Sequence, residues 1–396
     1  MRLSDGTHFK SDRPDGRLMS SMAAHMEYLR HLEPKLALPA DMTPEAFPAW
    51  QAMVRDKVLD LLCLPEETPQ PAPVRLSSVR RDGYTVEKWE LYPDDWTVVP
   101  FLLLLPDGAD AEHPVPCVLC LPGSIHSKEL LAGEPLLDRP TCRCMKYPER
   151  NCMAKHYVRN GMAAIAFDNP ETAEVALNTE REGEYGHTSR LHMCYGLVQA
   201  GLNYVGLTVA TLLKGLEFAK TLKQIDPERL AVSGHSLGTH PVAFLALLSE
   251  DIRAVVFNDF ICDERVRFTA ITEEEEDGMY QDTGGQHEIP GLWKWFGIQD
   301  VLAALAPKYL AINEGGAEDV RRVIRRGYAL AGAEDRLQES HYPKYADPAS
   351  RIWDGPMPDR GLTFEEFYDR SYVDVPDHSF RAEPSLRLLK RCFGLD

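Results

Sequence analysis

Short, continuously apolar segments alternate with longer amphipathic ones, and this alternation constrains the fold more than any other feature of the chain. Such segments occur at 117–121, 163–167, 230–233, 252–257, 309–313 and 337–342. Strands of a parallel sheet have this pattern, because helices cover both faces of the sheet. Helical patterns fall between them, at 152–160, 202–225, 237–248, 301–305, 318–331 and 383–392. The sequence therefore predicts an α/β fold with a mostly parallel sheet and helices on both faces.

The part of the chain before residue 117 has a different organisation. Segments 75–80, 84–92 and 96–105 alternate apolar and polar residues and are separated by Asp-rich turns, which is typical of antiparallel strands. Segments 18–32 and 44–64 have helical patterns and are followed by a Pro-rich stretch at 65–73. We therefore expect an N-terminal helical extension over 1–75. A main domain over 76–396 follows, with insertions near 169–200 and 260–300.

The charge of the chain excludes two classes of partner. Lys and Arg number 43 against 61 Asp and Glu, which gives a net charge of −18. Such a charge opposes binding to nucleic acid or to an anionic membrane surface. The first residues lack an apolar stretch after their charges, and we find no window long enough to cross a membrane. We expect a cytoplasmic protein.

The nine cysteines do not form a clear metal site. Cys117 and Cys120 lie in one predicted strand, where their odd spacing points the side chains to opposite faces. A second group, Cys142, Cys144 and Cys152 with His156, could surround zinc, but it lacks the second close pair that zinc sites usually have. We expect buried thiols and neither a metal nor another cofactor.

A predicted strand runs into Gly234-His-Ser236-Leu-Gly238 and then into an apolar helix. Small residues on both sides of Ser236 allow a sharp turn that projects the serine above the sheet edge. Ser236 is therefore the candidate nucleophile. The alternative is a Gly-rich N-terminus of a buried helix.

A serine hydroxyl needs a base within hydrogen-bonding reach and a group that orients that base. In this architecture both follow the nucleophile, with the acid before the histidine. His341 and His378 then remain as candidate bases. We favour His378, because its loop precedes the terminal helix and can reach over the sheet, whereas His341 falls in the last predicted strand.

Three carboxylates compete as the orienting acid after the predicted strand at 309–313. Glu314 is within reach of the strand, whereas Glu318 and Asp319 follow two glycines at which the chain can turn. We favour one of the latter pair and expect the other to be a carboxylate at a helix N-terminus.

The substrate oxyanion needs two N–H donors. The backbone N–H of Leu237 is one candidate, and the loop that contains Gly123 and Ser124 offers the second. Lys128 and Glu129, further along this loop, are expected to form a local ion pair.

From about residue 89 onward the chain resembles the acetyl xylan esterase-like α/β-hydrolases, close to dienelactone-hydrolase-type esterases. The resemblance is carried by residues 119–124, 128–135, 166–169, 233–239, 257–260, 305–307, 314–316 and 378–380. It implies Ser236 as nucleophile, His378 as base and an acid within 314–319. Relatives are expected to carry aspartate two residues after Gly-Gly, where this chain has Glu318 followed by Asp319. Glu318 is therefore favoured, with Asp319 as the alternative. Relatives also suggest a homo-oligomer.

The expected activity is hydrolysis of short acyl esters by a serine mechanism. The resemblance implies acetyl groups on carbohydrates, such as xylo-oligosaccharides. Trp293 and Trp295, in the insertion at 260–300, could stack on sugar rings or close a small lid core. A lactone hydrolase, a peptidase and a catalytically silent binding protein remain alternatives.

Overall fold

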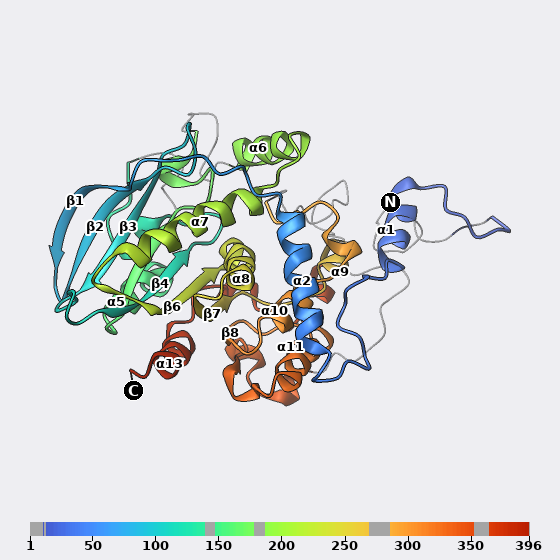
Figure 1. Ribbon diagram of the computed structural model, residues 1–396. Coiled ribbons are helices and arrows are strands. Elements are labelled where there is room, and N and C mark those ends of the chain that lie inside the picture. The colour runs from blue at the N-terminus through green and yellow to red at the C-terminus, as the bar shows by residue number, and fades with distance from the viewer. Residues whose placement is uncertain are drawn as a thin grey trace.

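The structure is a computed structural model, and it describes residues 11, 13–138, 147–177, 187–268, 286–351 and 364–395. A nine-stranded sheet with the order β1-β2-β3-β5-β4-β6-β7-β8-β9 forms its centre (Figure 1). The strands are β1 (Val74–Arg81), β2 (Tyr84–Leu91), β3 (Val99–Pro106), β4 (Val115–Leu121), β5 (Ala163–Phe167), β6 (Ile225–His235), β7 (Ile252–Asn258), β8 (Tyr309–Ile312) and β9 (Leu337–Glu339).

The sheet has an antiparallel N-terminal part and a parallel remainder, as the sequence predicted. The strands β1, β2 and β3 pair antiparallel in order, and β3 pairs antiparallel with β5. From β5 through β4 to β9, every pairing is parallel. The last strand ends at Glu339, so His341 lies beyond it. The prediction that His341 falls within this strand was therefore wrong. Because these strands are parallel, their carboxyl ends lie at the same edge of the sheet. Ligands bind at this edge in open α/β sheets.

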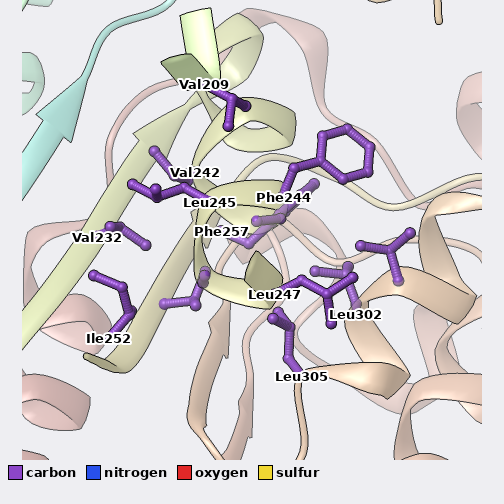
Figure 2. Close-up of a cluster of buried hydrophobic side chains, with 14 of the residues drawn as sticks. Val209, Val232, Val242, Phe244, Leu245, Leu247, Ile252, Phe257, Leu302 and Leu305 are labelled. Carbon is purple, nitrogen blue, oxygen red and sulfur yellow. The ribbon is translucent and has the colours of Figure 1, made fainter. Parts of the chain in front are cut away.

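Both faces of the parallel part of the sheet are buried. Cys117 and Leu119 of β4 belong to the larger apolar cluster, whereas Val118 and Cys120 belong to a second cluster. The two cysteines therefore face opposite sides, as predicted. Figure 2 shows the larger cluster where Val232 and Phe257 of the sheet pack against helical residues such as Leu245.

Helices cover both faces of the sheet. The larger cluster contains buried side chains of α2 (Phe47–Leu62), α7 (Tyr204–Thr221), α8 (Thr239–Leu248), α10 (Ile298–Ala304) and α11 (Glu318–Leu330). The second contains those of α3 (Lys128–Ala132), α5 (Met153–Val158) and α13 (Ala382–Phe393). The remaining helices are α1 (Ser21–Arg30), α4 (Pro148–Asn151), α6 (His187–Gln199), α9 (Glu264–Phe268) and α12 (Phe364–Arg370).

The N-terminal segment contributes directly to the larger core. Phe47, Trp50, Val54, Val58 and Leu62 of α2 are all buried in that cluster. The predicted extension at 1–75 therefore includes a core helix as well as α1.

Among the described residues, no single helix is long and apolar enough to span a membrane. One helix pair, Ser189–Gln199 with Tyr204–Thr221, has sufficient length and composition together, but it bends by 93°.

Candidate active site

Ser236 stands at the turn between β6 and α8. It has φ = 51°, in the left-handed region that non-glycine residues rarely adopt, and so carries the backbone strain expected of a nucleophile at such a turn. A Cβ atom at Gly234 would lie 2.3 Å from the carbonyl oxygen of Gly238. A Cβ atom at Gly238 would lie 2.4 Å from the carbonyl oxygen of Leu121 in β4. Both glycines are therefore required by close backbone contacts.

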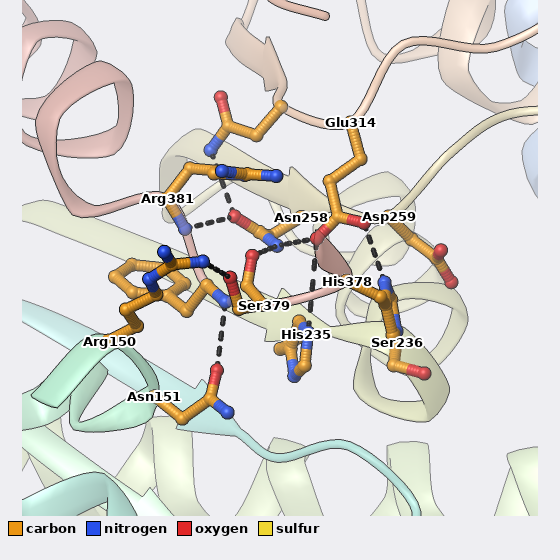
Figure 3. Close-up of polar contacts among 12 residues, drawn as sticks. Arg150, Asn151, His235, Ser236, Asn258, Asp259, Glu314, His378, Ser379 and Arg381 are labelled. Carbon is orange, nitrogen blue, oxygen red and sulfur yellow. Dashed lines mark hydrogen bonds and ion pairs between the residues drawn. The ribbon is translucent and has the colours of Figure 1, made fainter. Parts of the chain in front are cut away.

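His378 and Glu314 form the central polar pair of the site (Figure 3). His378 follows a short 3-10 turn before α13, and its Nδ1 lies 2.6 Å from Glu314 Oε2. The Glu314 side chain is fully buried. It also accepts hydrogen bonds from Asn258 Nδ2, at 2.6 Å, and from the Tyr342 hydroxyl. Burial raises the pKa of Glu314, and the charge and hydrogen bond of His378 oppose this rise.

The two carboxylates that we favoured from the sequence lie elsewhere. Glu318 is exposed on the first turn of α11 and bonds to Arg325 at 2.6 Å, and Asp319 lies 3.3 Å from Arg370. Glu314 bonds to His378 in their place. The glycines between them serve another contact, since a Cβ atom at Gly316 would lie 2.3 Å from the carbonyl oxygen of Ile261.

His341, the alternative base, is bound away from Glu314. Its ring nitrogens contact the guanidinium of Arg321, whose Nη1 lies 3.1 Å from His341 Nδ1. Burial, followed by the positive charge of Arg321, lowers the pKa of His341 to about 3. The ring is therefore neutral at physiological pH and part of the Arg321 contact.

Ser236 and His378 are brought together by His235, the last residue of β6. The ring of His235 stacks on that of His378 with centroids 4.7 Å apart. The His235 ring also stacks on the ring of His126, with centroids 5.5 Å apart. Because Ser236 directly follows His235, this stacking brings the nucleophile to the neighbourhood of His378 (Figure 3).

His235, Glu314 and His378 together have the side-chain donor atoms of a possible metal site. One ligand atom each of His235, Glu314 and His378 lies within 4.8 Å of the others. Of the zinc group considered in the sequence, Cys142 and Cys144 lie outside the described residues, and Cys152 Sγ lies 3.6 Å from His156 Nε2.

The predicted oxyanion donors lie on the two segments next to the nucleophile. Leu237 is buried directly after Ser236, and a Cβ atom at Gly123 would lie only 3.4 Å from Ser236 Cβ. The carbonyl of Gly123 accepts the N–H of His126 at 3.2 Å. The Asn169 amide donates to the Pro122 carbonyl at 2.7 Å. The loop that carries Ser124 is therefore held beside the nucleophile.

Further along this loop, Lys128 is fully buried among carboxylates. Its Nζ lies 2.9 Å from Glu129, 2.8 Å from Asp168 and 2.6 Å from Glu174. Burial lowers the pKa of Lys128, but the three carboxylates outweigh burial and raise it above its ordinary value. The predicted Lys128–Glu129 ion pair is confirmed, and the group ties the loop to the end of β5.

A cavity of about 430 Å³ opens near the site and has mostly apolar walls. It is lined by His240, one helical turn after Ser236, and by Asp259, which follows β7. Trp293 lines this cavity and donates its N–H to Glu264 at 3.2 Å. Trp295 does not line it, and the ammonium groups of Lys35 and Lys57 lie over its ring, 5.1 and 4.3 Å from the ring centroid. Both tryptophans pack partly buried against the larger apolar cluster, and of the two Trp293 alone lines the cavity. A contact of either ring with substrate stays a prediction.

A model of the Abhydrolase family matches residues 2–391. The chain belongs to this family. The crystal structure of a Bacteroides fragilis protein proposed to be an acetyl xylan esterase is 34% identical in sequence, with a TM-score of 0.90, and the match covers 99% of this chain and 100% of that one. The predicted membership of the acetyl xylan esterase-like α/β-hydrolases is thereby confirmed.

More distant members of the fold also match. A methylesterase is 15% identical with a TM-score of 0.55 over 92% of this chain and 74% of that one. A glucuronoyl esterase from Solibacter usitatus is 12% identical with a TM-score of 0.52 over 91% of this chain and 97% of that one. No curated protein matches the chain.

Several residues around this site were not assigned a role from the sequence, although Asn258 lies in a segment that carries the resemblance. Asn258 and Tyr342 hold Glu314 but come from two different strand ends. Arg190 lies in α6, a helix that falls in the predicted insertion at 169–200 and was not itself predicted. Only the position of Glu314 directly after an apolar strand could have been used from the sequence.

Proposed function

We propose that this member of the Abhydrolase family is a serine esterase that removes short acyl groups, acetyl above all, from carbohydrates such as xylo-oligosaccharides. The chain is a carboxylic ester hydrolase by its family and its esterase neighbours. The 34%-identical neighbour, itself proposed to be an acetyl xylan esterase, supports the narrower substrate. The strained Ser236 beside the buried His378–Glu314 pair is the single observation that carries the mechanism.

In the proposed reaction Ser236 Oγ attacks the ester carbonyl while His378 Nε2 takes the hydroxyl proton. Glu314 holds the Nδ1 proton of the ring and stabilises the imidazolium, because its carboxylate is buried 2.6 Å away. The N–H groups of Leu237 and Ser124 stabilise the oxyanion. His378 then protonates the leaving sugar alcohol. Water, activated by the same histidine, attacks the acyl-enzyme and releases the acid and Ser236.

The cavity that His240 and Asp259 line is proposed as the place for the carbohydrate part of the substrate. Its walls include the aromatic rings of Phe260, Phe268 and Trp293 together with the polar groups of His240 and Glu264. Aromatic faces with a few polar groups suit a sugar ring, which has both apolar C–H faces and hydroxyl edges.

Acetate release from acetylated xylo-oligosaccharides and p-nitrophenyl acetate tests this function. We expect Ser236→Ala to lower kcat by about 10⁴-fold or more, since a triad without its nucleophile keeps only the binding and oxyanion contributions. Ser77→Ala, which removes an exposed serine from β1, is the control and should leave the rate unchanged. An active Ser236→Ala enzyme would contradict the serine mechanism. Turnover of lactones or peptides in preference to acetyl esters would contradict the substrate.

A further inference from the structure

Arg190 is fully buried on α6 next to the loop that carries Ser124. Its Nη2 donates hydrogen bonds to the Ser124 carbonyl and to Thr172 Oγ1, both at 2.7 Å. It also lies 3.5 Å from the carbonyl oxygen of Glu171. All three acceptors are neutral oxygens, so none of them balances the guanidinium charge.

No carboxylate among the described residues forms an ion pair with Arg190, and its Nε and Nη1 are buried without a hydrogen-bond partner. The carboxylate of Glu171 instead accepts hydrogen bonds from the Ser189 hydroxyl at 2.8 Å and from the Leu177 N–H at 3.1 Å. An unpaired charge is costly to bury, and buried cations are usually paired. Lys128 in the same region meets three carboxylates, which makes Arg190 the exception.

The backbone around these acceptors is strained. Glu171 and Ala173, on either side of Thr172, have φ values of 53° and 52°. Non-glycine residues rarely adopt this region, and such strain is concentrated where a local arrangement has a function. Here the two strained residues flank the segment whose Glu171 carbonyl and Thr172 hydroxyl contact the guanidinium.

The helix that carries Arg190 also packs near the other predicted oxyanion donor, Leu237. Cys194, one turn after Arg190 on α6, packs in one apolar cluster with Leu237. The helix that carries the unpaired cation therefore contacts both segments that hold the predicted donors, Ser124 by a hydrogen bond and Leu237 through Cys194. Because Arg190 is fully buried, it acts on the reaction through these segments and not by touching substrate.

We propose that Arg190 is a positioning residue for ester hydrolysis: its hydrogen bond to the Ser124 carbonyl holds the loop that presents the Ser124 N–H, and its charge, which no carboxylate among the described residues pairs, stabilises the oxyanion. This inference rests on the proposed serine mechanism. Negative charge develops on the substrate oxygen only in the transition state, so the cation lowers the barrier without strengthening substrate binding. The guanidinium charge of Arg190, which is costly to bury in the resting protein, is balanced by the oxyanion in the transition state.

The test compares Arg190→Gln with Arg190→Lys in acetate release. Glutamine keeps a donor for the Ser124 carbonyl but removes the charge, whereas lysine keeps the charge. We expect R190Q to lower kcat by about 10–100-fold with KM within about threefold, and R190K to recover kcat to within about fivefold of wild type. Arg229→Gln removes a cation in the first half of β6, away from Ser236, and should leave both constants unchanged.

A second readout separates charge stabilisation from a merely structural role. A boronic acid forms an anionic tetrahedral adduct with an activated serine, so R190Q should weaken boronic acid inhibition in parallel with kcat. Folded R190Q with wild-type kcat, or R190K as slow as R190Q, would overturn the proposal. Should R190Q not fold, R190K decides alone, and loss of either kcat or boronic acid affinity overturns it.

Failure of this inference is distinguishable from failure of the proposed function. Ser236→Ala with wild-type activity refutes the serine mechanism and the role of Arg190 together. An inactive Ser236→Ala enzyme alongside a fully active R190Q enzyme refutes only the role of Arg190.

Discussion

Glu314 bonds to His378 because it lies two residues after the end of β8, at the edge formed by the carboxyl ends of the strands, where its side chain is buried. Asn258, at the end of the neighbouring β7, and Tyr342, after β9, fix its two oxygens. A local motif could identify Ser236, and chain order could narrow the histidines, because both depend on residues close in sequence. The acid depends on contacts among three strand ends, and spacing alone therefore pointed to Glu318.

Replacing Glu314 by glutamine tests this assignment at the residue scale. We expect Glu314→Gln to lower kcat by about 10³–10⁴-fold, because the amide cannot stabilise the imidazolium and favours the wrong ring tautomer. Glu318→Gln is the matched control, since Glu318 is half exposed and bonds to Arg325. Steady-state acetate release measures both. Equal losses in the two variants, or a loss only in E318Q, would restore the assignment made from the sequence.

At the scale of elements, apolar patterning predicted the parallel strands well, because strands buried on both faces have a continuous apolar signal. The strand β5 coincides with its predicted segment at 163–167, whereas β9 is shorter than predicted. The helix α6 was missed because polar and apolar residues are mixed along it, and it is stabilised by contacts with Leu237 and Tyr204. A helix that is stabilised mainly by such tertiary contacts has only a weak apolar periodicity in its own sequence.

The turn between β6 and α8 gives the prediction at this scale. We expect Gly234→Ala to destabilise the protein by at least about 2–3 kcal/mol. The new Cβ would clash with the Gly238 backbone, which cannot move aside as a flexible side chain can. Gly196→Ala on α6 is the control. A Cβ there meets nothing within 4 Å, and the change should stabilise by about 0.5–1 kcal/mol. Urea unfolding measures both, and equal midpoints for G234A and wild type would show that the turn can relax.

At the scale of the whole molecule, the chain is built around one large sheet, and the N-terminal residues contribute to its core. The predicted boundary near residue 75 rested on a change from a helical to a strand pattern. That change is real, but α2 packs against α7, α8 and α10 across the chain. A pattern break in sequence therefore marks a change of element here, while the packing continues across it.

Truncating one buried side chain of α2 tests how far the molecule depends on this packing. Trp50 is buried, stacks on Phe47 with centroids 5.4 Å apart and donates its N–H to the Leu36 carbonyl at 3.0 Å. We expect Trp50→Ala to lower the free energy of unfolding by about 3–5 kcal/mol. Met53→Ala on the exposed face of the same helix should change it by less than about 0.5 kcal/mol.

Denaturation followed by acetate release and by tryptophan fluorescence distinguishes two arrangements. If α2 belongs to the main core, Trp50→Ala shifts the loss of activity and the fluorescence transition to lower urea together, because the core unfolds as a unit. A fluorescence transition that separates from a wild-type loss of activity would instead show that residues 1–75 unfold on their own. The exposed Met53→Ala variant should leave both transitions where wild type has them.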